Sequence, residues 1–320
     1  MPREIHIATG ARLHFGLLAH GTRTGREFGG VGVMIDRPGF RIRASRAPVD
    51  ELACGDWSSS VEMYLARLRA AAPAVVPPGL RIEIHEAPPA HAGFGSGTQL
   101  GMALARICST MAGESDVSAE ELARRAGRGR RSAVGLYGFA LGGLVIEAGK
   151  FTEKEISPLV ARVEFPAEWR FVLVRPRGAA GISGTDESSG FARLGPMPDS
   201  VTGSLCRIAM TEIIPSTRDR DFLKASAAIG RFGRLVGEYF APVQGGIFAD
   251  DKMQQLAERL SARNISGFGQ TSWGPTVFTL CANDSQAAEL VAELSQVPSC
   301  RDCELTVASP LNRGARVEAR

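Results

Sequence analysis

The chain has 320 residues, of which 44% are hydrophobic and 22% charged, and its net charge is +3. This composition is typical of a globular protein long enough to form two domains. A small, dispersed charge with only three Trp and three Tyr argues against a nucleic-acid-binding surface.

Membrane and zinc-binding classes are also disfavoured. The longest apolar stretch, 136–146, contains glycines and is too short to cross a bilayer, and the first residues lack the apolar core of a signal peptide. Of six cysteines, only Cys300 and Cys303 form a CxxC pair, which predicts reduced structural thiols rather than a zinc site. We therefore expect a cytoplasmic enzyme with small-molecule substrates and no nucleic-acid or membrane partner.

The first half of the chain mixes strands and helices. Alternation predicts strands at 4–8, 40–44 and 80–85, and a short buried strand is expected at 144–147. Two apolar runs, 12–18 and 31–35, lie between the first two of these strands. We expect helices at 60–71 and from the glycine-rich segment to about 111, and a capping box at 118–121 opens another.

The second half begins after a break at 158–166. The pattern predicts a strand at 169–174, a long irregular loop at 175–200, and helices from about 201, 221 and 250. A strand at 277–281, a helix capped by Asp284 and a final strand at 304–308 follow. Without regular β-α repetition, the chain favours two α+β domains, 1–163 and 164–320.

The segment 89–99 is a candidate phosphate-binding loop. Gly93, Gly95 and Gly97 are interleaved with Phe94 and Ser96, and Thr98 and Gln99 lead into an apolar helical run. Glycines allow close backbone approach to a ligand, and the N-terminus of a helix favours an anion. The spacing fits neither the Walker loop nor the dinucleotide fingerprint. The alternative interpretation is a simple turn in which Ser96 or Thr98 caps the helix.

Three arginine-containing patterns point to the same chemistry. In the segment 12–15, Arg12 and His14 share one face of an extended strand and can grip an anion, unless that face is merely exposed. Arg26, in the adjoining loop, adds to the same positive surface. The basic run 128–132 borders an apolar, glycine-rich segment, which favours Arg130, Arg131 or Ser132 pointing into a pocket over a solvated charge run.

Two further loops carry candidate residues. The glycine-rich segment 267–276 offers Gln270, Thr271 and Ser272 as neutral hydrogen-bonding groups and Trp273 as a flat apolar face. Its alternative interpretation is a tight turn with a core tryptophan. The acidic pair Asp186 and Glu187 either holds Mg²⁺ beside a diphosphate or forms a solvated turn.

The segments 8–16, 89–99 and 267–276 resemble the three signature segments of the GHMP kinase superfamily, the galacto-, homoserine, mevalonate and phosphomevalonate kinases. That resemblance implies an N-terminal domain like ribosomal protein S5 and a ferredoxin-like C-terminal domain. The chain departs from the kinase pattern at Gly97, where kinases commonly have a serine that helps hold Mg²⁺. It departs again at Gly135, where they commonly have a catalytic aspartate. A glycine can do neither task.

A closer resemblance is to the family of β-ribofuranosylaminobenzene 5′-phosphate synthases. It is carried by Arg-Leu-His-Phe-Gly at 12–16, Phe-Gly-Gly-Val-Gly at 28–32, Gly-Ser-Gly-Thr-Gln at 95–99, Arg-Arg-Ser at 130–132, Gly-Gly at 142–143, Pro215, Gln-Gly-Gly at 244–246 and Gly-Gln-Thr-Ser-Trp-Gly-Pro at 269–275. This family condenses phosphoribosyl pyrophosphate with 4-aminobenzoate or 4-hydroxybenzoate and releases CO₂ and diphosphate, early in tetrahydromethanopterin biosynthesis. The resemblance makes a homodimer plausible.

The resemblance implies a decarboxylating pentosyltransferase and a set of roles. Catalytic roles fall to Arg12, His14, Arg131 and Ser132. Substrate-binding roles fall to Arg26, Gly93, Gly95, Ser96, Gly97, Thr98, Gln99, Arg130, Gln270, Ser272 and Trp273. Asp186 and Glu187 are candidate ligands of a Mg²⁺ ion that accompanies the diphosphate. Two alternatives stay open: an ATP-dependent small-molecule kinase that uses the 89–99 loop, and a non-catalytic phosphate-binding protein.

Overall fold

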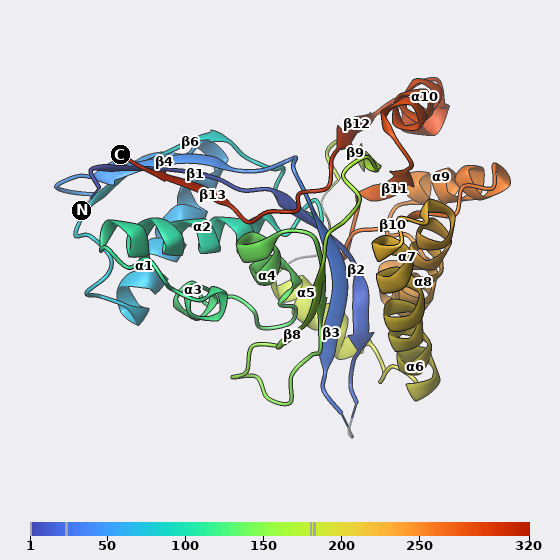
Figure 1. The fold of residues 1–320 in the computed structure, drawn as a ribbon, viewed down its shortest axis with the longest axis horizontal. Helices are drawn as coiled ribbons and strands as arrows, with labels where there is room; N and C mark the ends of the chain where they lie inside the picture. The colour runs from blue at the N-terminus through green and yellow to red at the C-terminus, as the bar shows by residue number, and fades with distance from the viewer. Residues whose placement is uncertain (1, 23–24, 180, 182–183) are drawn as a thin grey trace.

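A computed structural model describes residues 2–320 except 23–24, 180 and 182–183, and residues 184–186 by their backbone alone. Three sheets and their helices form the molecule (Figure 1). The first sheet has the order β13-β1-β4-β6-β5. Its strands are β1 (Glu4–Ala8), β4 (Arg41–Arg46), β5 (Glu51–Ala53), β6 (Leu80–Glu86) and β13 (Arg316–Ala319).

Helices cover one face of this sheet. They are α1 (Ser58–Ala71), α2 (Ser96–Met111) and α3 (Ala119–Arg125), preceded by a short 3₁₀ turn at Gly55–Trp57. Ile5 and Ile7 alternate with less buried residues along β1, so their side chains point toward these helices and enter one core. Burial of this apolar face fixes the position of α2, whose first residues follow the glycine-rich loop.

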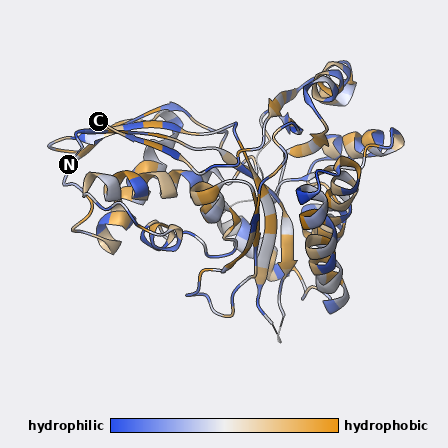
Figure 2. Ribbon diagram, viewed as in Figure 1, coloured by the Kyte–Doolittle hydropathy of each residue, from blue (hydrophilic) through white to orange (hydrophobic). Residues whose placement is uncertain are grey.

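The second sheet runs through the middle of the molecule. Its order is β2-β3-β7-β8, with strands β2 (Ala11–Ala19), β3 (Phe28–Ile35), β7 (Leu144–Glu147) and β8 (Leu159–Val163). Every residue of β3 is buried, because α4 (Val134–Leu141) contacts one side of the sheet and α8 (Phe222–Gln244) contacts β2. Figure 2 shows hydrophobic residues concentrated along β2 and β3.

The third sheet is antiparallel with the order β10-β11-β9-β12. Its strands are β9 (Arg170–Pro176), β10 (Phe268–Gln270), β11 (Val277–Cys281) and β12 (Cys303–Ala308). The helices of the second half are α5 (Gly184–Arg193), α6 (Asp199–Ile208), α7 (Ile214–Arg218), α8, α9 (Asp251–Ala262) and α10 (Asp284–Leu294), with a π turn at Ala209–Ile213 and a 3₁₀ turn at Pro298–Cys300. The six cysteines are free thiols.

Most of the predicted elements are confirmed, three expectations are corrected and one element was not predicted. The loop expected at 175–200 contains α5, which packs Phe191 against Phe240 and Trp273. The segment 134–141, for which no element was predicted, forms a helix that is hydrophobic on all sides and is buried from Val134 to Phe139. Asn283, rather than Asp284, caps α10 through the amide of Gln286. The last strand is β13 rather than the strand at 304–308.

The α+β class is confirmed, while the division at 163/164 stays a prediction. In the C-terminal half, β13 pairs antiparallel with β1, so the end of the chain returns to the first sheet. A second hydrophobic core lies between the second sheet and the helices of the second half. It also joins the two halves, because it contains residues of β2 and β3 together with residues of α8 and β11. A ligand site at the junction would therefore draw residues from both halves.

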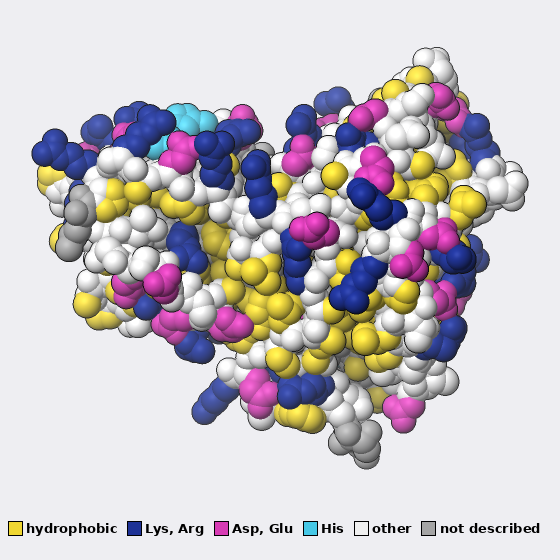
Figure 3. Space-filling model, viewed as in Figure 1, with side chains coloured by type: hydrophobic (Ala, Val, Ile, Leu, Met, Phe, Trp, Pro, Cys, Tyr) yellow, Lys and Arg dark blue, Asp and Glu magenta, His cyan; other side chains and the backbone are white. Residues whose placement is uncertain are grey.

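The surface agrees with the dispersed charge of the sequence. Figure 3 shows Lys and Arg side chains interspersed with Asp and Glu across the face in view. Among the described residues, none of the helices combines the length and the apolar character that a bilayer-spanning segment needs.

Candidate functional site

The glycine-rich loop ends at the N-terminus of α2. Gly95 caps this helix in a left-handed conformation, with φ +68° and no capping bond from a side chain, so neither Ser96 nor Thr98 is the N-cap. The amides of Thr98 and Gln99 donate to the carbonyl of Gly95. The amides of Ser96 and Gly97 precede the first intrahelical bonds and are available to an anion.

Arg12, on β2, lies against this loop. Its Nη1 donates to the carbonyl of Gly93 at 3.1 Å. A Cβ atom on Gly95 would lie 2.8 Å from Cγ of Arg12, and one on Gly135 would lie 3.9 Å from it. The stem of Arg12 therefore lies between the beginnings of α2 and α4. Burial lowers the pKa of Arg12 to about 10, opposed by Glu187 and assisted by Arg128, so this guanidinium remains charged at neutral pH.

His14 follows on the same face of β2 and is only 4% exposed. Its Nε2 lies 3.1 Å from Oγ of Ser132, and Oγ of Ser132 accepts the amide of Val134 at the start of α4. Burial, together with the charge of Arg12, holds the pKa of His14 well below its usual value. The imidazole is therefore neutral at pH 7, and it is fixed by the loop that precedes α4.

Glu147, at the end of β7, completes this cluster and was missed in the sequence. It is fully buried, and its carboxylate accepts the amides of Ala133 at 3.1 Å and Gly149 at 3.3 Å. Burial raises its pKa, and hydrogen bonds that include Ser132 oppose that shift. A Cβ atom on Gly30 would lie 2.9 Å from Nε2 of His14 and 3.2 Å from Oε1 of Glu147. We call His14, Ser132 and Glu147 the buried polar cluster.

A second guanidinium reaches the loop, and it belongs to Arg128. Its Nε and Nη2 donate to Oγ1 of Thr98 at 3.2 and 2.9 Å. A Cβ atom on Gly97 would lie 3.8 Å from Nη2 of Arg128 and 3.4 Å from the hydroxyl oxygen of Tyr64. The predicted Arg130 is exposed instead. The sequence placed a basic run here, but it could not tell which of its arginines faces the helix.

Arg131 is held by α5. It forms an ion pair with Glu187, donates to Oγ of Ser188 at 2.7 Å, and lies over the ring of Phe191 at 5.3 Å from its centroid. Glu187 is also close enough to Arg12 to affect its pKa. The side chain of Asp186 lies outside the described residues. The structure thus brings Glu187 to the site as the partner of an arginine.

Arg26 does not join the glycine-rich loop. Its Nη1 donates to the carbonyl of Gly149 at 3.1 Å, and its guanidinium lies 4.4 Å from the centroid of the Phe151 ring and 3.9 Å from Glu155. The expected addition to the positive surface around Arg12 is therefore corrected. Arg26 stabilises the 149–155 segment behind Glu147.

The turn at 271–276 supports the site from the second half of the chain. Thr271 Oγ1 accepts the amide of His14 and donates to the carbonyl of Gly93, each at 2.9 Å. The amide of Ser272, at φ +57°, donates to the carbonyl of His14 at 3.2 Å. One turn therefore fixes the loop and the strand together. The sequence indicates Thr271 only as a hydrogen-bonding group and does not identify it as a site residue.

Three predicted binding residues have structural contacts. Trp273 is 6% exposed, with its ring 4.6 Å from that of Phe240. The amide group of Gln270 bonds to the amide of Ala249 at 2.7 Å and to the carbonyl of Ser272 at 3.2 Å. Gln99 is 1% exposed and donates to the carbonyl of Gly135 at 2.9 Å, joining α2 to α4. Direct ligand contacts by these side chains stay predictions.

The arrangement of these groups suits an anionic ligand. Two guanidinium groups, those of Arg12 and Arg128, lie beside the beginning of α2, and α4 begins on the other side of Arg12. These charges attract anions, and Glu187, the described carboxylate that affects the pKa of Arg12, is itself paired with Arg131. Among the described side chains, no group of three or more His, Cys, Asp or Glu residues is arranged to bind a metal ion.

Comparisons with known proteins show which families the chain is similar to. The family model for the GHMP kinases N-terminal domain matches residues 60–143 of this chain. The beta-ribofuranosylphenol 5′-phosphate synthase of Methanothermobacter thermautotrophicus is 26% identical, over 98% of each chain. That of Archaeoglobus fulgidus is also 26% identical, over 98% of this chain and 99% of its own. The resemblance to these synthases is thereby confirmed over nearly the whole chain.

Solved structures confirm the fold. The homoserine kinase of Cytophaga hutchinsonii superimposes with a TM-score of 0.72 at 14% identity, over 99% of this chain and 98% of its own. The mevalonate diphosphate decarboxylase of Staphylococcus aureus gives 0.71 at 12% identity, over the same shares. The chain has the α+β fold of these proteins.

Proposed function

We propose that this chain, which has the GHMP kinase fold and is related along its length to ribofuranosylphenol phosphate synthases, is a decarboxylating pentosyltransferase. It condenses phosphoribosyl pyrophosphate with 4-hydroxybenzoate or 4-aminobenzoate, in the cytoplasm and early in tetrahydromethanopterin biosynthesis. The observation that supports this best is that glycine stands at both position 97 and position 135, while Arg12 and Arg128 lie beside the same helix start. We call Arg12, Arg128 and the first turn of α2 the cradle. The site can hold phosphate, yet it has glycine where the kinase pattern has its catalytic aspartate.

The reaction needs no base at that position. An electron pair of the arene forms the bond from the carboxylate-bearing ring carbon to the anomeric carbon, and the bond to diphosphate breaks with its pair on oxygen. The bond to the carboxylate then breaks, CO₂ departs and its electron pair restores the aromatic ring. No proton leaves a ring carbon, so positioning and charge stabilisation supply the catalysis.

The residues divide this work. Arg12, Arg128 and the amides of Ser96 and Gly97 bind the diphosphate and stabilise the charge that develops as it leaves. Neutral His14, held by Ser132, orients the arene or its carboxylate. Arg131 is positioned by Glu187 at the edge of the site and contributes to binding of the second anionic group.

Mg²⁺ fits this site as a companion of the substrate. Glu187 is already paired with Arg131, and the described side chains contain no group of three or more His, Cys, Asp or Glu residues placed to bind a metal ion. Mg²⁺ commonly binds through one or two carboxylates and substrate phosphates. We propose that the ion arrives with the diphosphate, whose charge it neutralises, and that protein ligands contribute little.

A single assay tests the proposal. The protein is incubated with phosphoribosyl pyrophosphate, Mg²⁺ and carboxyl-labelled 4-hydroxybenzoate or 4-aminobenzoate, and labelled CO₂ is collected. We expect CO₂ release that requires phosphoribosyl pyrophosphate. A parallel incubation with ATP and alcohol acceptors should yield no ADP. ADP formation without CO₂ release in the first assay would replace the proposal with a small-molecule kinase.

A further inference from the structure

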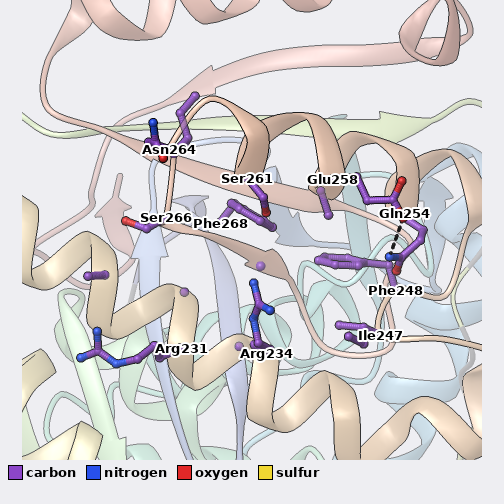
Figure 4. A pocket seen from close by; sticks show the side chains of 16 residues that line it. Arg231, Arg234, Ile247, Phe248, Gln254, Glu258, Ser261, Asn264, Ser266 and Phe268 are labelled. Atoms are coloured by element: carbon purple, nitrogen blue, oxygen red, sulfur yellow. Dashed lines mark hydrogen bonds between the residues drawn. The ribbon is translucent and has the colours of Figure 1, made fainter.

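A cavity of about 640 Å³ lies in the second half of the molecule, and the glycine-rich loop takes no part in it. One wall is a face of α8, the other is a face of α9, and Phe268 and Gly269 of β10 lie between them (Figure 4). Gly230 and Gly233 lie on the α8 wall beside Arg231 and Arg234. The volume is in the range of small-molecule sites.

The chemistry of the lining is specific. Phe248 and Phe268 lie at one side with ring centroids 6.3 Å apart and an interplanar angle of 26°. Arg234 extends from α8 into the middle of the cavity, and within the part of the chain that the structure describes it has no ion-pair partner (Figure 4). Arg231, by contrast, is paired with Glu212. The cavity therefore offers a flat apolar surface and an uncompensated cation.

The third feature of the lining is a hydrogen-bond acceptor without a donor, on Gln254. Nε2 of Gln254 donates to Glu258 at 3.2 Å, but Oε1 of Gln254 is buried and has no partner among the described residues. A buried oxygen without a partner costs free energy, which a ligand N–H or O–H group would recover. The three features together define a ligand with a ring, an anionic group and a donor.

We propose that this cavity is a second ligand site, for an arene that carries a hydroxyl or amino donor and an anionic group. Arg234 binds the anion, Phe248 and Phe268 contact the ring, and Oε1 of Gln254 accepts the donor. The identity of the occupant rests on the proposed function, because both the benzoate substrate and the aryl ribotide product have these three groups. The volume favours the larger ribotide.

The site is connected to the catalytic one through β10. Gly269 lines the cavity, and the next residue, Gln270, bonds to the amide of Ala249 and to the carbonyl of Ser272. Ser272 in turn donates to the carbonyl of His14. A ligand that orders the 247–249 segment therefore acts on the turn that fixes His14, and product binding here would modulate the enzyme.

Isothermal titration calorimetry tests the proposal, with three ligands: 4-(β-ribofuranosyl)phenol 5′-phosphate, 4-hydroxybenzoate and inorganic phosphate. A Cβ atom on Gly233 would lie no closer than 3.6 Å to its nearest neighbour, so Gly233→Leu should fill the cavity without a clash. Gly203→Leu, on an open helical position of α6, is the matched control. Arg234→Met removes the cation and keeps most of the stem.

We expect two equivalents of ribotide to bind per wild-type or Gly203→Leu chain, and one per Gly233→Leu chain with kcat/KM unchanged. Arg234→Met should weaken the second equivalent at least tenfold. A second equivalent of 4-hydroxybenzoate instead of ribotide would identify the substrate as the occupant. One equivalent of either ligand in the wild type, or phosphate alone binding as tightly, would overturn the proposal.

Two further readouts separate the possible failures. If Gly233→Leu changes the sedimentation coefficient from that of a dimer to that of a monomer, the cavity belongs to a subunit interface and the proposal fails. The CO₂ assay is independent of these titrations. Absence of CO₂ release with two binding equivalents would reject the proposed function and leave the cavity site standing.

Discussion

At the residue scale, His14 and the arginines around it decide the character of the site. His14 lies beside a permanently charged guanidinium in a buried position, and both effects favour its neutral form. A neutral imidazole can accept one hydrogen bond and donate another, whereas a charged one would only donate. Its protonation state is therefore set by burial and by Arg12.

The low pKa of His14 predicts a pH dependence of stability. An unfolded histidine binds a proton near pH 6.5, while the folded one stays neutral, so the free energy of unfolding should fall as the pH drops below about 6.5. This one group contributes a slope of at most about 1.4 kcal/mol per pH unit. Urea denaturation between pH 5 and 7.5 measures it. His14→Gln should reduce the slope, and an equal slope in that variant would contradict the prediction.

Arg128 and Arg130 form a matched pair for testing the cradle. Arg128→Met removes the guanidinium that contacts Thr98, so we expect KM for phosphoribosyl pyrophosphate to rise about tenfold or more. Arg130→Met changes an exposed side chain and should leave KM within about twofold. Steady-state kinetics at fixed benzoate distinguish the two. Equal changes in KM for the two variants would mean that the arginine in contact with Thr98 is not the one that binds the substrate.

At the element scale, the beginnings of α2 and α4 define the site. Both helices start beside Arg12, and Gln99 joins them through the carbonyl of Gly135. Two glycines occupy the start of α2, but for different reasons. Gly95 has a left-handed conformation and touches Arg12, whereas Gly97 lies in the first turn of α2 with room for a Cβ atom.

This difference predicts opposite results for one substitution. Gly95→Ala places a Cβ atom 2.8 Å from Arg12 and forces a left-handed alanine, so it should lower the free energy of unfolding by about 1–3 kcal/mol. Gly97→Ala should leave stability unchanged or raise it by up to about 1 kcal/mol. Thermal denaturation compares the two variants. Comparable destabilisation would show that Gly97 is also conformationally required.

At the scale of the whole molecule, the site depends on contact between the two halves of the chain. Thr271 lies 257 positions after His14 and bonds to its amide, and it also bonds to Gly93. The hydroxyl of Thr279 is also buried but has no partner among the described residues. These two threonines test what the long-range contact contributes.

Thr271→Val should leave the amide of His14 without its partner, because valine keeps the shape and removes the hydroxyl. We expect a loss of about 1–3 kcal/mol in the free energy of unfolding and a lower kcat. Thr279→Val removes an unpartnered hydroxyl and should be neutral or stabilising. Chemical denaturation and CO₂ release report both effects. A destabilising Thr279→Val with a silent Thr271→Val would reverse the assignment.

Local patterns were sufficient for much of the fold. β1 and β11 have the predicted bounds, and Ser118 caps α3 as its capping box predicts. The sequence did not predict α5 because its glycines and serines are typical of a loop, whereas tertiary contacts of Phe191, Glu187 and Ser188 hold the helix in place. Glu147 was missed because an acid at the end of an apolar strand acquires its meaning from the amides and hydroxyls around it.

The sequence by itself determined the resemblance to the synthases and the two glycines that argue against kinase chemistry, and it predicted the phosphate-binding loop. These features depend on residue types that lie close together in the sequence, so local backbone preferences are enough to recognise them. Only the tertiary structure decided that Arg128 rather than Arg130 reaches the loop, that Arg26 lies elsewhere and that Glu147 and Thr271 support His14. Such pairings join strands and turns far apart in the chain, so burial and hydrogen bonding across the folded core select them.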